Sequence, residues 1–171
     1  DYFCDLPFSE WDKFDERVTR LTKQILNLFD QYSATATFFT LGYIGEKHPE
    51  LIELIVSKGH EIASHGNHHL DARKISQEEF ELDISISQKI LSKLSGEKIL
   101  GFRAPFFSID KKNLWALDIV KKYYKYDSSL FPIRTPLYGI PEGRRTPYYV
   151  SDSNPLEESI QETFLEIPPA T

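Results

Sequence analysis

Short strand-like segments alternate with helix-like segments along most of this chain, and this alternation constrains the fold more than any other feature. The strand candidates are rich in β-branched and aromatic side chains, and they cover residues 35–41, 60–64, 99–103, 123–127 and 164–167. Helical patterns fill most of the intervals between them. Such alternation favours parallel strands joined by helical crossovers, and it predicts an α/β barrel or an open α/β sheet.

The helix signals between these strands are of three kinds. Residues 16–32 repeat apolar side chains at helical spacing, at Val18, Leu21, Ile25, Leu28 and Phe29. Pro49 stands where it would occupy the first turn of a second helix, which Gly59 would end. Ser76 and Glu79 have the spacing of a capping box, and they predict the start of a longer helix.

Two later segments carry less regular signals. Asp110 is expected to cap a helix whose apolar residues include Leu114, Leu117 and Val120. Residues 130–155 are rich in proline and show no period, so they predict a long surface excursion.

Composition excludes several classes of function. Of 171 residues, 40% are hydrophobic and 27% are charged, which is ordinary for one globular domain with a sizeable core. A net charge of −6 offers no basic patch to a phosphate backbone, so we expect no nucleic acid partner. The single cysteine, Cys4, cannot form an internal disulfide. No apolar run approaches the ~20 residues of a membrane-spanning helix.

Reactive side chains follow several of the predicted strands at the point where each strand ends. His65, Arg103 and Asp127 hold such positions, and Asp1 would hold one after a strand preceding the chain. The carboxyl ends of parallel strands open on one face, where α/β proteins build their active sites. We therefore expect these four residues on one rim, a pattern that core packing alone does not predict.

Four of the five histidines lie within residues 60–69. Imidazole titrates near neutral pH and binds borderline-soft metals. His65 and His69 are four apart and would share one face of a helical turn, with His68 as the competing partner. A catalytic zinc ion commonly takes three protein ligands and a water, and Asp1 is the best-placed carboxylate. The alternative is a polar loop with a fortuitous histidine pair, and His60 is expected to be structural.

Weaker signals accompany the other strand ends. Arg103 could pin a carboxylate through two hydrogen bonds, or it could form a surface ion pair of little energetic value. Asp127 and Ser128 could belong to a site, or to a turn or helix cap. Aromatic residues in the proline-rich stretch could pack in the core or offer flat surfaces to sugar rings, namely Tyr138, Tyr148 and Tyr149.

Three segments, taken in order, resemble a known family. They are ATFFTLGYIGEKHPELIELIVSKGHEIASHGNHH at 36–69, GFRAPFFSID at 101–110 and YDSSLFP at 126–132. Together they resemble the NodB-like polysaccharide deacetylases, carbohydrate esterase family four. The opening DYF, WDKF at 11–14 and YGIP at 138–141 resemble the branch found with bacterial exopolysaccharide loci. The resemblance covers almost the whole chain.

This resemblance implies a fold and a metal site. The family has a distorted (β/α)7 barrel similar to a TIM barrel, and residues 1–171 would form a single truncated NodB homology domain, incomplete at both ends. The Asp-His-His metal triad of the family matches Asp1, His65 and His69, which would hold one divalent ion. We expect zinc, with cobalt, nickel or manganese as alternatives.

The resemblance also implies roles for other residues. Arg103 would orient a catalytic base, Asp127 is expected to take part in catalysis, and the backbone N–H of Phe106 would hold the oxyanion. The expected substrate contacts are Pro105, Ser128 and Tyr138. The base aspartate and the acid histidine of the family would lie outside this chain.

We therefore expect a metal-dependent hydrolase that uses metal-activated water to remove acetyl groups from the N-acetylated sugars of a polysaccharide or oligosaccharide. The alternatives are a hydrolase of small cyclic amides from the same superfamily and a carbohydrate-binding domain without catalysis. A bacterial origin is implied, with the cytoplasm as the expected compartment and the periplasm or a membrane surface as alternatives. Without an external base and acid, residues 1–171 alone are expected to deacetylate poorly.

Overall fold

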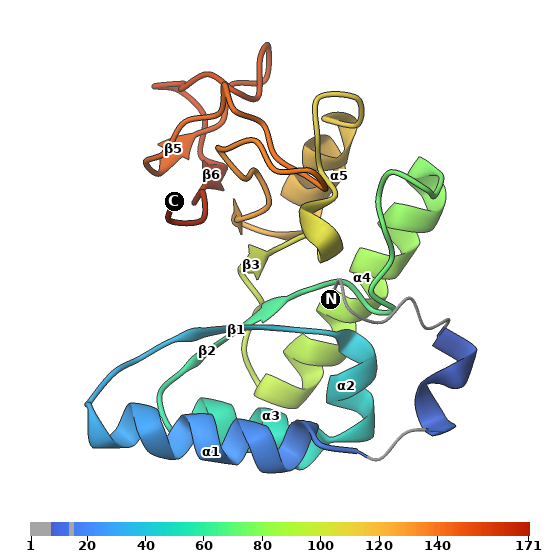
Figure 1. Ribbon diagram of the computed structural model, residues 1–171, viewed down its shortest axis with the longest axis vertical. Helices are drawn as coiled ribbons and strands as arrows, with labels where there is room; N and C mark the ends of the chain where they lie inside the picture. The colour runs from blue at the N-terminus through green and yellow to red at the C-terminus, as the bar shows by residue number, and fades with distance from the viewer. Residues whose placement is uncertain (1–7, 14–15) are drawn as a thin grey trace.

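The protein is an α/β structure built on one six-stranded sheet (Figure 1). The computed structural model describes residues 8–13 and 16–171. The strands lie in the order β1-β2-β3-β4-β6-β5, so among the described residues β1 and β5 form the two edges of an open sheet. All neighbouring pairs are parallel except β5 and β6, which are antiparallel. The predicted parallel α/β architecture is therefore confirmed.

Each of the five strand candidates contains a strand, usually shorter than the sequence pattern indicated. The strands are β1 Thr37–Thr40, β2 Glu61–Ser64, β3 Gly101–Phe102, β4 Tyr126–Asp127, β5 Tyr148–Tyr149 and β6 Leu165–Glu166. β5 was not predicted. It lies inside the proline-rich stretch and pairs through Tyr148 and Tyr149 with β6, so this stretch is not purely a surface excursion.

The helices cover the sheet and connect its parallel strands. They are α1 Val18–Gln31, α2 Gly42–Lys47, α3 Pro49–Ser57, α4 Gln77–Ser95 and α5 Trp115–Tyr123, with short 3-10 turns η1 Phe8–Lys13 and η2 Pro105–Phe107. α3 and α4 both pack against β2, and α4 also contacts α2, α3 and α5. This central position makes α4 the main support of the strand ends. None of the described helices is long and apolar enough to cross a membrane.

The start of α4 is fixed as the sequence predicts. The backbone N–H of Glu79 donates to the Ser76 hydroxyl, and the backbone N–H of Ser76 donates to the Glu79 carboxylate. Gly96 ends the helix in a left-handed conformation, with φ of 73°.

The predicted Asp110 cap of α5 is wrong. Asp110 accepts the backbone N–H of Lys112 in a turn, and α5 begins only at Trp115.

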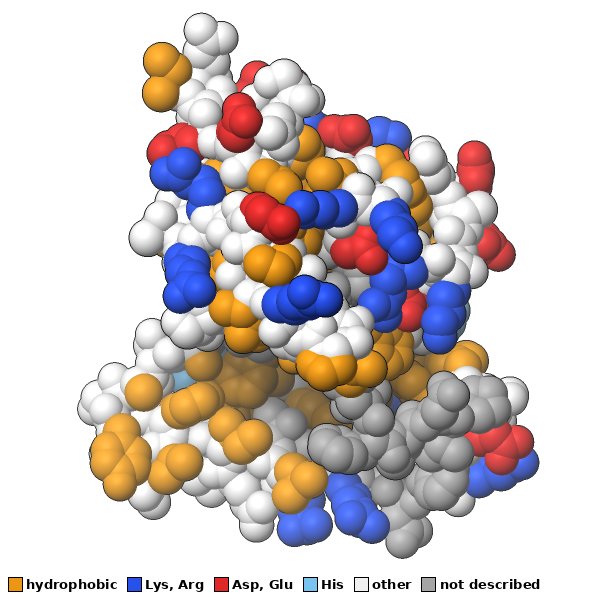
Figure 2. All heavy atoms as spheres, turned by 45° about the horizontal axis from the view of Figure 1, so that its top comes forward, with side chains coloured by type: hydrophobic (Ala, Val, Ile, Leu, Met, Phe, Trp, Pro, Cys, Tyr) orange, Lys and Arg blue, Asp and Glu red, His pale blue; other side chains and the backbone are white. Residues whose placement is uncertain are grey.

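One hydrophobic core runs through the molecule, and it includes Leu26, Ile52, Ile84, Phe102 and Val120. α1 contributes Leu26 to it, but the same helix also presents apolar residues to solvent. They are Leu21, Ile25 and Leu28, with 42%, 45% and 51% of their surface exposed. Figure 2 shows apolar side chains at the surface in the lower part of the molecule, where α1 lies.

Candidate metal and catalytic site

The carboxyl ends of β2, β3 and β4 lie side by side at one rim of the sheet. Ser64 is the register partner of Phe102, and Phe102 is the partner of Asp127. The backbone N–H of Arg103 donates to the Ser64 carbonyl over 2.9 Å. His65, Arg103 and Asp127 therefore share one rim, as expected. Asp1 lies outside the described residues, so its place on the rim and its proposed metal role stay predictions.

The histidine pair comes together in a loop after β2. The rings of His65 and His69 are 5.2 Å apart between centroids and inclined by 65°. The expected helical turn is wrong, because Gly66 and His69 both adopt positive φ, at 77° and 57°. The tight loop, rather than a helix face, brings the two rings together. A left-handed histidine is a sparsely populated conformation, of the kind found at functional sites.

Asp83 of α4 fixes the backbone of this loop. Its carboxylate accepts the backbone N–H of Asn67 over 2.8 Å and that of His68 over 3.0 Å. Burial raises the pKa of Asp83, and the two N–H donors oppose that shift. A Cβ atom on Gly66 would lie 2.7 Å from the Asp83 carboxylate, so the close approach requires glycine. Sequence reasoning missed Asp83, although it stands beside Ile84 and three residues after Phe80, on the face of α4 that is buried.

His68 contacts other residues than His65 and His69. Its Nδ1 lies 3.5 Å from the Asp83 carboxylate, and its ring packs against Phe8 with centroids 4.5 Å apart. His68 is thus the weaker partner for His65.

His60 is buried, and its Nδ1 accepts the backbone N–H of Ala36, which confirms the expected structural role.

His65 is oriented by the neighbouring strand. Its Nδ1 lies 2.7 Å from the backbone carbonyl of Arg103. Since a carbonyl only accepts, Nδ1 must carry the hydrogen, which leaves the lone pair on Nε2. Burial lowers the pKa of His65 to about 4 and also lowers that of His69. Both rings are therefore neutral near pH 7, the form that binds a metal.

These observations fit a metal ion in part. Two neutral imidazoles lie together, and the orientation of His65 follows the usual arrangement in which the second ring nitrogen donates to a carbonyl. Within residues 8–13 and 16–171, no group of three or more His, Cys, Asp or Glu side chains gathers as a metal cluster. The described residues thus offer two nitrogen ligands, and a third ligand would come from outside them.

Arg103 is held firmly at the same rim. Its Nε donates to the Ser128 carbonyl over 3.0 Å, and its Nη2 donates to the Ser128 hydroxyl over 2.6 Å. The guanidinium lies 4.0 Å from the ring centroid of Phe39 and 5.6 Å from that of Phe107. This half-buried setting differs from the surface ion pair considered as the alternative. It presents a fixed cation close to the histidine pair.

Asp127 and Ser128 are buried at this rim, and their expected catalytic and substrate-binding roles stay predictions. Asp127 is 0% exposed and Ser128 is 2% exposed. The Asp127 carboxylate accepts the backbone N–H and the hydroxyl of Ser129, and the Ser128 hydroxyl donates to the Ile167 carbonyl. Ser128 thus holds the Arg103 guanidinium, and Asp127 holds the next residue of the turn, Ser129.

The turn after β3 brings aromatic rings to the site. Phe106 has φ of 60°, and its ring lies 4.5 Å from that of His69 between centroids. Its expected role as an oxyanion donor stays a prediction. Pro105 is buried, and its expected substrate contact stays a prediction. Its ring fixes the turn that positions Phe106.

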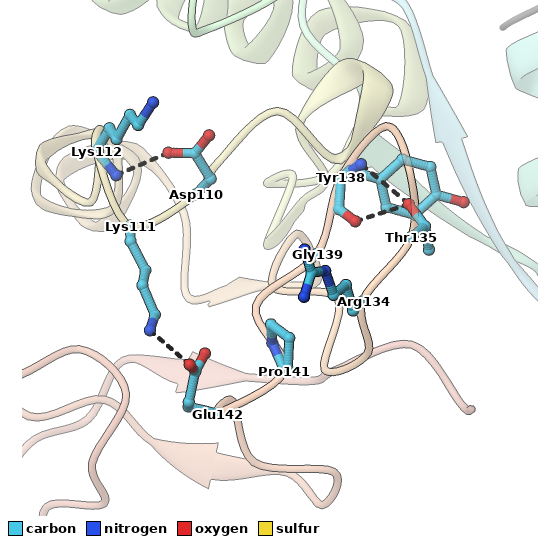
Figure 3. Close-up of a pocket in the computed structure, with 9 residues that line it drawn as sticks. All are labelled: Asp110, Lys111, Lys112, Arg134, Thr135, Tyr138, Gly139, Pro141 and Glu142. Atoms are coloured by element: carbon cyan, nitrogen blue, oxygen red, sulfur yellow. Dashed lines mark hydrogen bonds and ion pairs between the residues drawn. The ribbon is translucent and has the colours of Figure 1, made fainter.

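A cavity of about 420 Å³ opens beside Tyr138, and Figure 3 shows its lining. The Tyr138 ring packs against Phe107 and Phe131, with centroids 5.1 and 5.0 Å apart. The lining combines Tyr138 with charged groups, among them Lys111 and Glu142, which form an ion pair of 2.8 Å. Tyr148, by contrast, is buried with its hydroxyl bonded to the Pro155 carbonyl, so it offers no surface to a sugar.

A second cavity, of about 380 Å³, shares Asp110 and Lys112 with the first. It continues toward Arg73, whose guanidinium donates to the Leu137 carbonyl over 2.9 Å and so links the segment after the histidine loop to the segment before Tyr138. The two cavities adjoin at Asp110 and Lys112 and are together called the groove below; His65, His69 and Arg103 are not among their lining residues.

Comparisons with known proteins identify a matching family and several relatives. The family model described as polysaccharide deacetylase matches residues 11–123. A peptidoglycan-N-acetylglucosamine deacetylase of Bacillus cereus is 40% identical over 84 residues, which cover 49% of this chain and 39% of that protein. The chain therefore spans about two-fifths of the length of this relative.

Solved structures show the same fold. A polysaccharide deacetylase structure from Mycobacterium smegmatis aligns with a TM-score of 0.66 at 23% identity, over 86% of this chain and 45% of that one. The structure of Puue allantoinase aligns with a TM-score of 0.67 at 23% identity, over 88% and 43%. At these identities the likeness establishes the architecture alone.

Proposed function

Because the chain belongs to the polysaccharide deacetylase family, we propose that it binds a metal ion and hydrolyses acetamide groups on the N-acetylated sugars of a polysaccharide. One observation carries the proposal. Two neutral histidines lie side by side, one of them oriented by a backbone carbonyl, next to a fixed arginine on the same rim.

The proposed cofactor is a divalent metal ion held by His65, His69 and Asp1. Zinc is the first choice, with cobalt, nickel or manganese as alternatives, because imidazole and carboxylate ligands suit all of them. When bound, such an ion polarises the acetamide carbonyl and makes a water molecule acidic enough to be a nucleophile near pH 7.

The residues of this chain would then position the reacting groups. Arg103 is fixed by Ser128, so its guanidinium can hold the carboxylate of a general base in one orientation. The backbone N–H of Phe106 would donate to the oxyanion of the tetrahedral intermediate. The strained φ of Phe106 is consistent with a backbone that is held for such a purpose.

The groove beside Tyr138 supports a polymeric substrate. Tyr138 would pack against a sugar ring, and the charged lining around Lys112 and Arg134 would contact its polar substituents. A hydrolase of small cyclic amides would not use such an extended surface. A sugar-binding domain without catalysis would use the groove and not the histidine pair.

The test is release of acetate from an N-acetylglucosamine oligomer by the protein, loaded with zinc and after removal of zinc by a chelator. His69→Gln should abolish both zinc binding and zinc-dependent release, whereas the control His48→Gln, at the junction of α2 and α3, should retain them. Undiminished zinc-dependent release by His69→Gln would contradict the proposal. Turnover of a cyclic amide without acetate release would favour the alternative hydrolase.

A further inference from the structure

Two carboxyl groups lie buried next to each other beneath the rim. Asp127 of β4 and Glu166 of β6 are register partners in adjacent parallel strands. Both side chains are 0% exposed. Neither shares a salt bridge with a lysine or arginine among the described residues. Two ionised carboxylates in this arrangement would repel each other in a medium that screens charge poorly.

The hydrogen bonds around the pair distinguish its two members. Asp127 accepts at both oxygens, from the Ser129 backbone N–H over 2.9 Å and from the Ser129 hydroxyl over 2.6 Å. Glu166 accepts at Oε1 from the backbone N–H of Leu130 over 3.1 Å. Its Oε2 is buried and receives no hydrogen bond from any described residue. A buried carboxylate oxygen without a donor is costly, whereas a protonated carboxyl can itself donate.

From this arrangement we propose that Glu166 is protonated at neutral pH, donates its proton to the ionised carboxylate of Asp127, and is thereby a positioning residue for Arg103. Glu166 does not contact solvent or substrate, so it acts only through the groups that it holds.

The electrostatic environment agrees with this assignment. Burial raises the pKa of both acids, and the neighbouring Asp127 raises that of Glu166 further, well above its ordinary value. Arg103 opposes the shift of Glu166. Tyr148 of β5 also interacts with the pair, and burial, Glu166 and Asp127 together raise the pKa of its hydroxyl.

A short path connects Glu166 to the rim. Glu166 and Asp127 fix the backbone of Leu130 and Ser129, and these residues continue the turn that begins at Ser128. Ser128 in turn receives both hydrogen bonds of the Arg103 guanidinium. Loss of the shared proton would place two like charges under this turn and displace Arg103. Only this last step rests on the proposed function, because the protonation of Glu166 stands without it.

The experiment follows the side-chain carboxyl carbons by NMR over a pH titration of the protein. Glu166→Gln identifies the Glu166 signal and mimics a neutral acid, since its oxygen can accept from Leu130 and its amide can donate to Asp127. The matched control is Glu97→Gln, which removes the same charge at an exposed position. We expect the Glu166 carbon to show the protonated form at pH 7 and to titrate far above an ordinary glutamic acid.

A second comparison shows which acid carries the proton. Glu166→Gln should retain the amide signals of Ser129 and Leu130, whereas Asp127→Asn should shift them, because its amide group cannot accept from both Ser129 donors. An ionised Glu166 at pH 7, or tolerance of Asp127→Asn with loss of the turn in Glu166→Gln, would overturn the proposal.

Activity is read separately in the zinc-loaded protein. Glu166→Gln should keep its turnover at alkaline pH where the natural protein loses it, while Glu97→Gln should follow the natural pH profile. An identical alkaline limb in Glu166→Gln would overturn the positioning role. If no variant or natural protein released acetate, the proposed function would fail while the NMR result would still decide the protonation of Glu166.

Discussion

At the scale of single residues, the side chains of the site owe their positions to backbone groups and buried acids. His65 is oriented by the Arg103 carbonyl, Arg103 by Ser128, and the histidine loop by Asp83. The sequence predicts His65 and Arg103, because a polar residue directly after a strand reaches the active rim of a parallel sheet, and it predicts His69 from its spacing to His65. It does not reveal Asp83 or Glu166 as supports, because their partners Asn67 and Leu130 lie far away in the chain.

Asp83→Asn should weaken zinc binding. An amide can accept only one of the two N–H groups from Asn67 and His68, so the histidine loop loses one of its restraints. Substitution of residues that orient metal ligands commonly lowers the affinity for the metal by ~10- to 100-fold, and we expect a loss of about tenfold here. The measurement is competition for zinc with a chromophoric chelator. Glu78→Gln, an exposed change on the same helix, is the control and should bind zinc like the natural protein.

The metal-free protein should lose stability as pH falls. The pKa of His65 is about 4 when folded and near 6.5 when unfolded, so the unfolded state binds more protons between these values. The free energy of unfolding should therefore decrease from pH 6.5 down to about pH 4, by ~1–3 kcal/mol from this group. Urea unfolding across that range measures the decrease. His65→Gln should make the curve flatter there, and an unchanged slope would contradict the assignment.

At the scale of elements, the sequence predicts regular structure best where local chemistry decides it. The capping box of α4 works as its pattern indicates, because Ser76 and Glu79 are close in the chain. The start of α5 was mispredicted because Asp110 binds its own turn. β5 was missed because its pairing with β6 depends on residues far along the chain, which a proline-rich pattern does not show.

The loop after β2 gives a matched test of its close packing. Gly66 and Gly59 have nearly equal φ values of 77° and 78°, but only Gly66 has a carboxylate where a Cβ would lie. Gly59→Ala should cost ~1–2 kcal/mol from backbone strain alone. Gly66→Ala should cost clearly more and should also lower zinc affinity, because it displaces Asp83 or the loop. Thermal unfolding and zinc titration of both variants make the comparison, and equal costs would contradict the close approach.

At the scale of the whole molecule, the fold is an open parallel sheet with one antiparallel edge, and the site lies at its carboxyl rim. The sequence predicts this architecture from the alternation of strands and helices. It does not predict that α1 exposes Leu21, Ile25 and Leu28, because helical periodicity identifies an apolar face without identifying what covers it. The predicted third metal ligand, Asp1, lies outside the described residues.

The metal site is tested most directly by X-ray absorption spectroscopy of the zinc-loaded protein, with His65→Gln and His69→Gln measured beside it. The natural protein should bind one zinc ion with two imidazole nitrogens at ~2.0–2.1 Å and oxygen in the remaining positions. Each single variant should lose one imidazole and most of its zinc affinity, while the control His68→Gln should keep both imidazoles. Full zinc affinity and two imidazole ligands in His65→Gln or His69→Gln would contradict the proposed site.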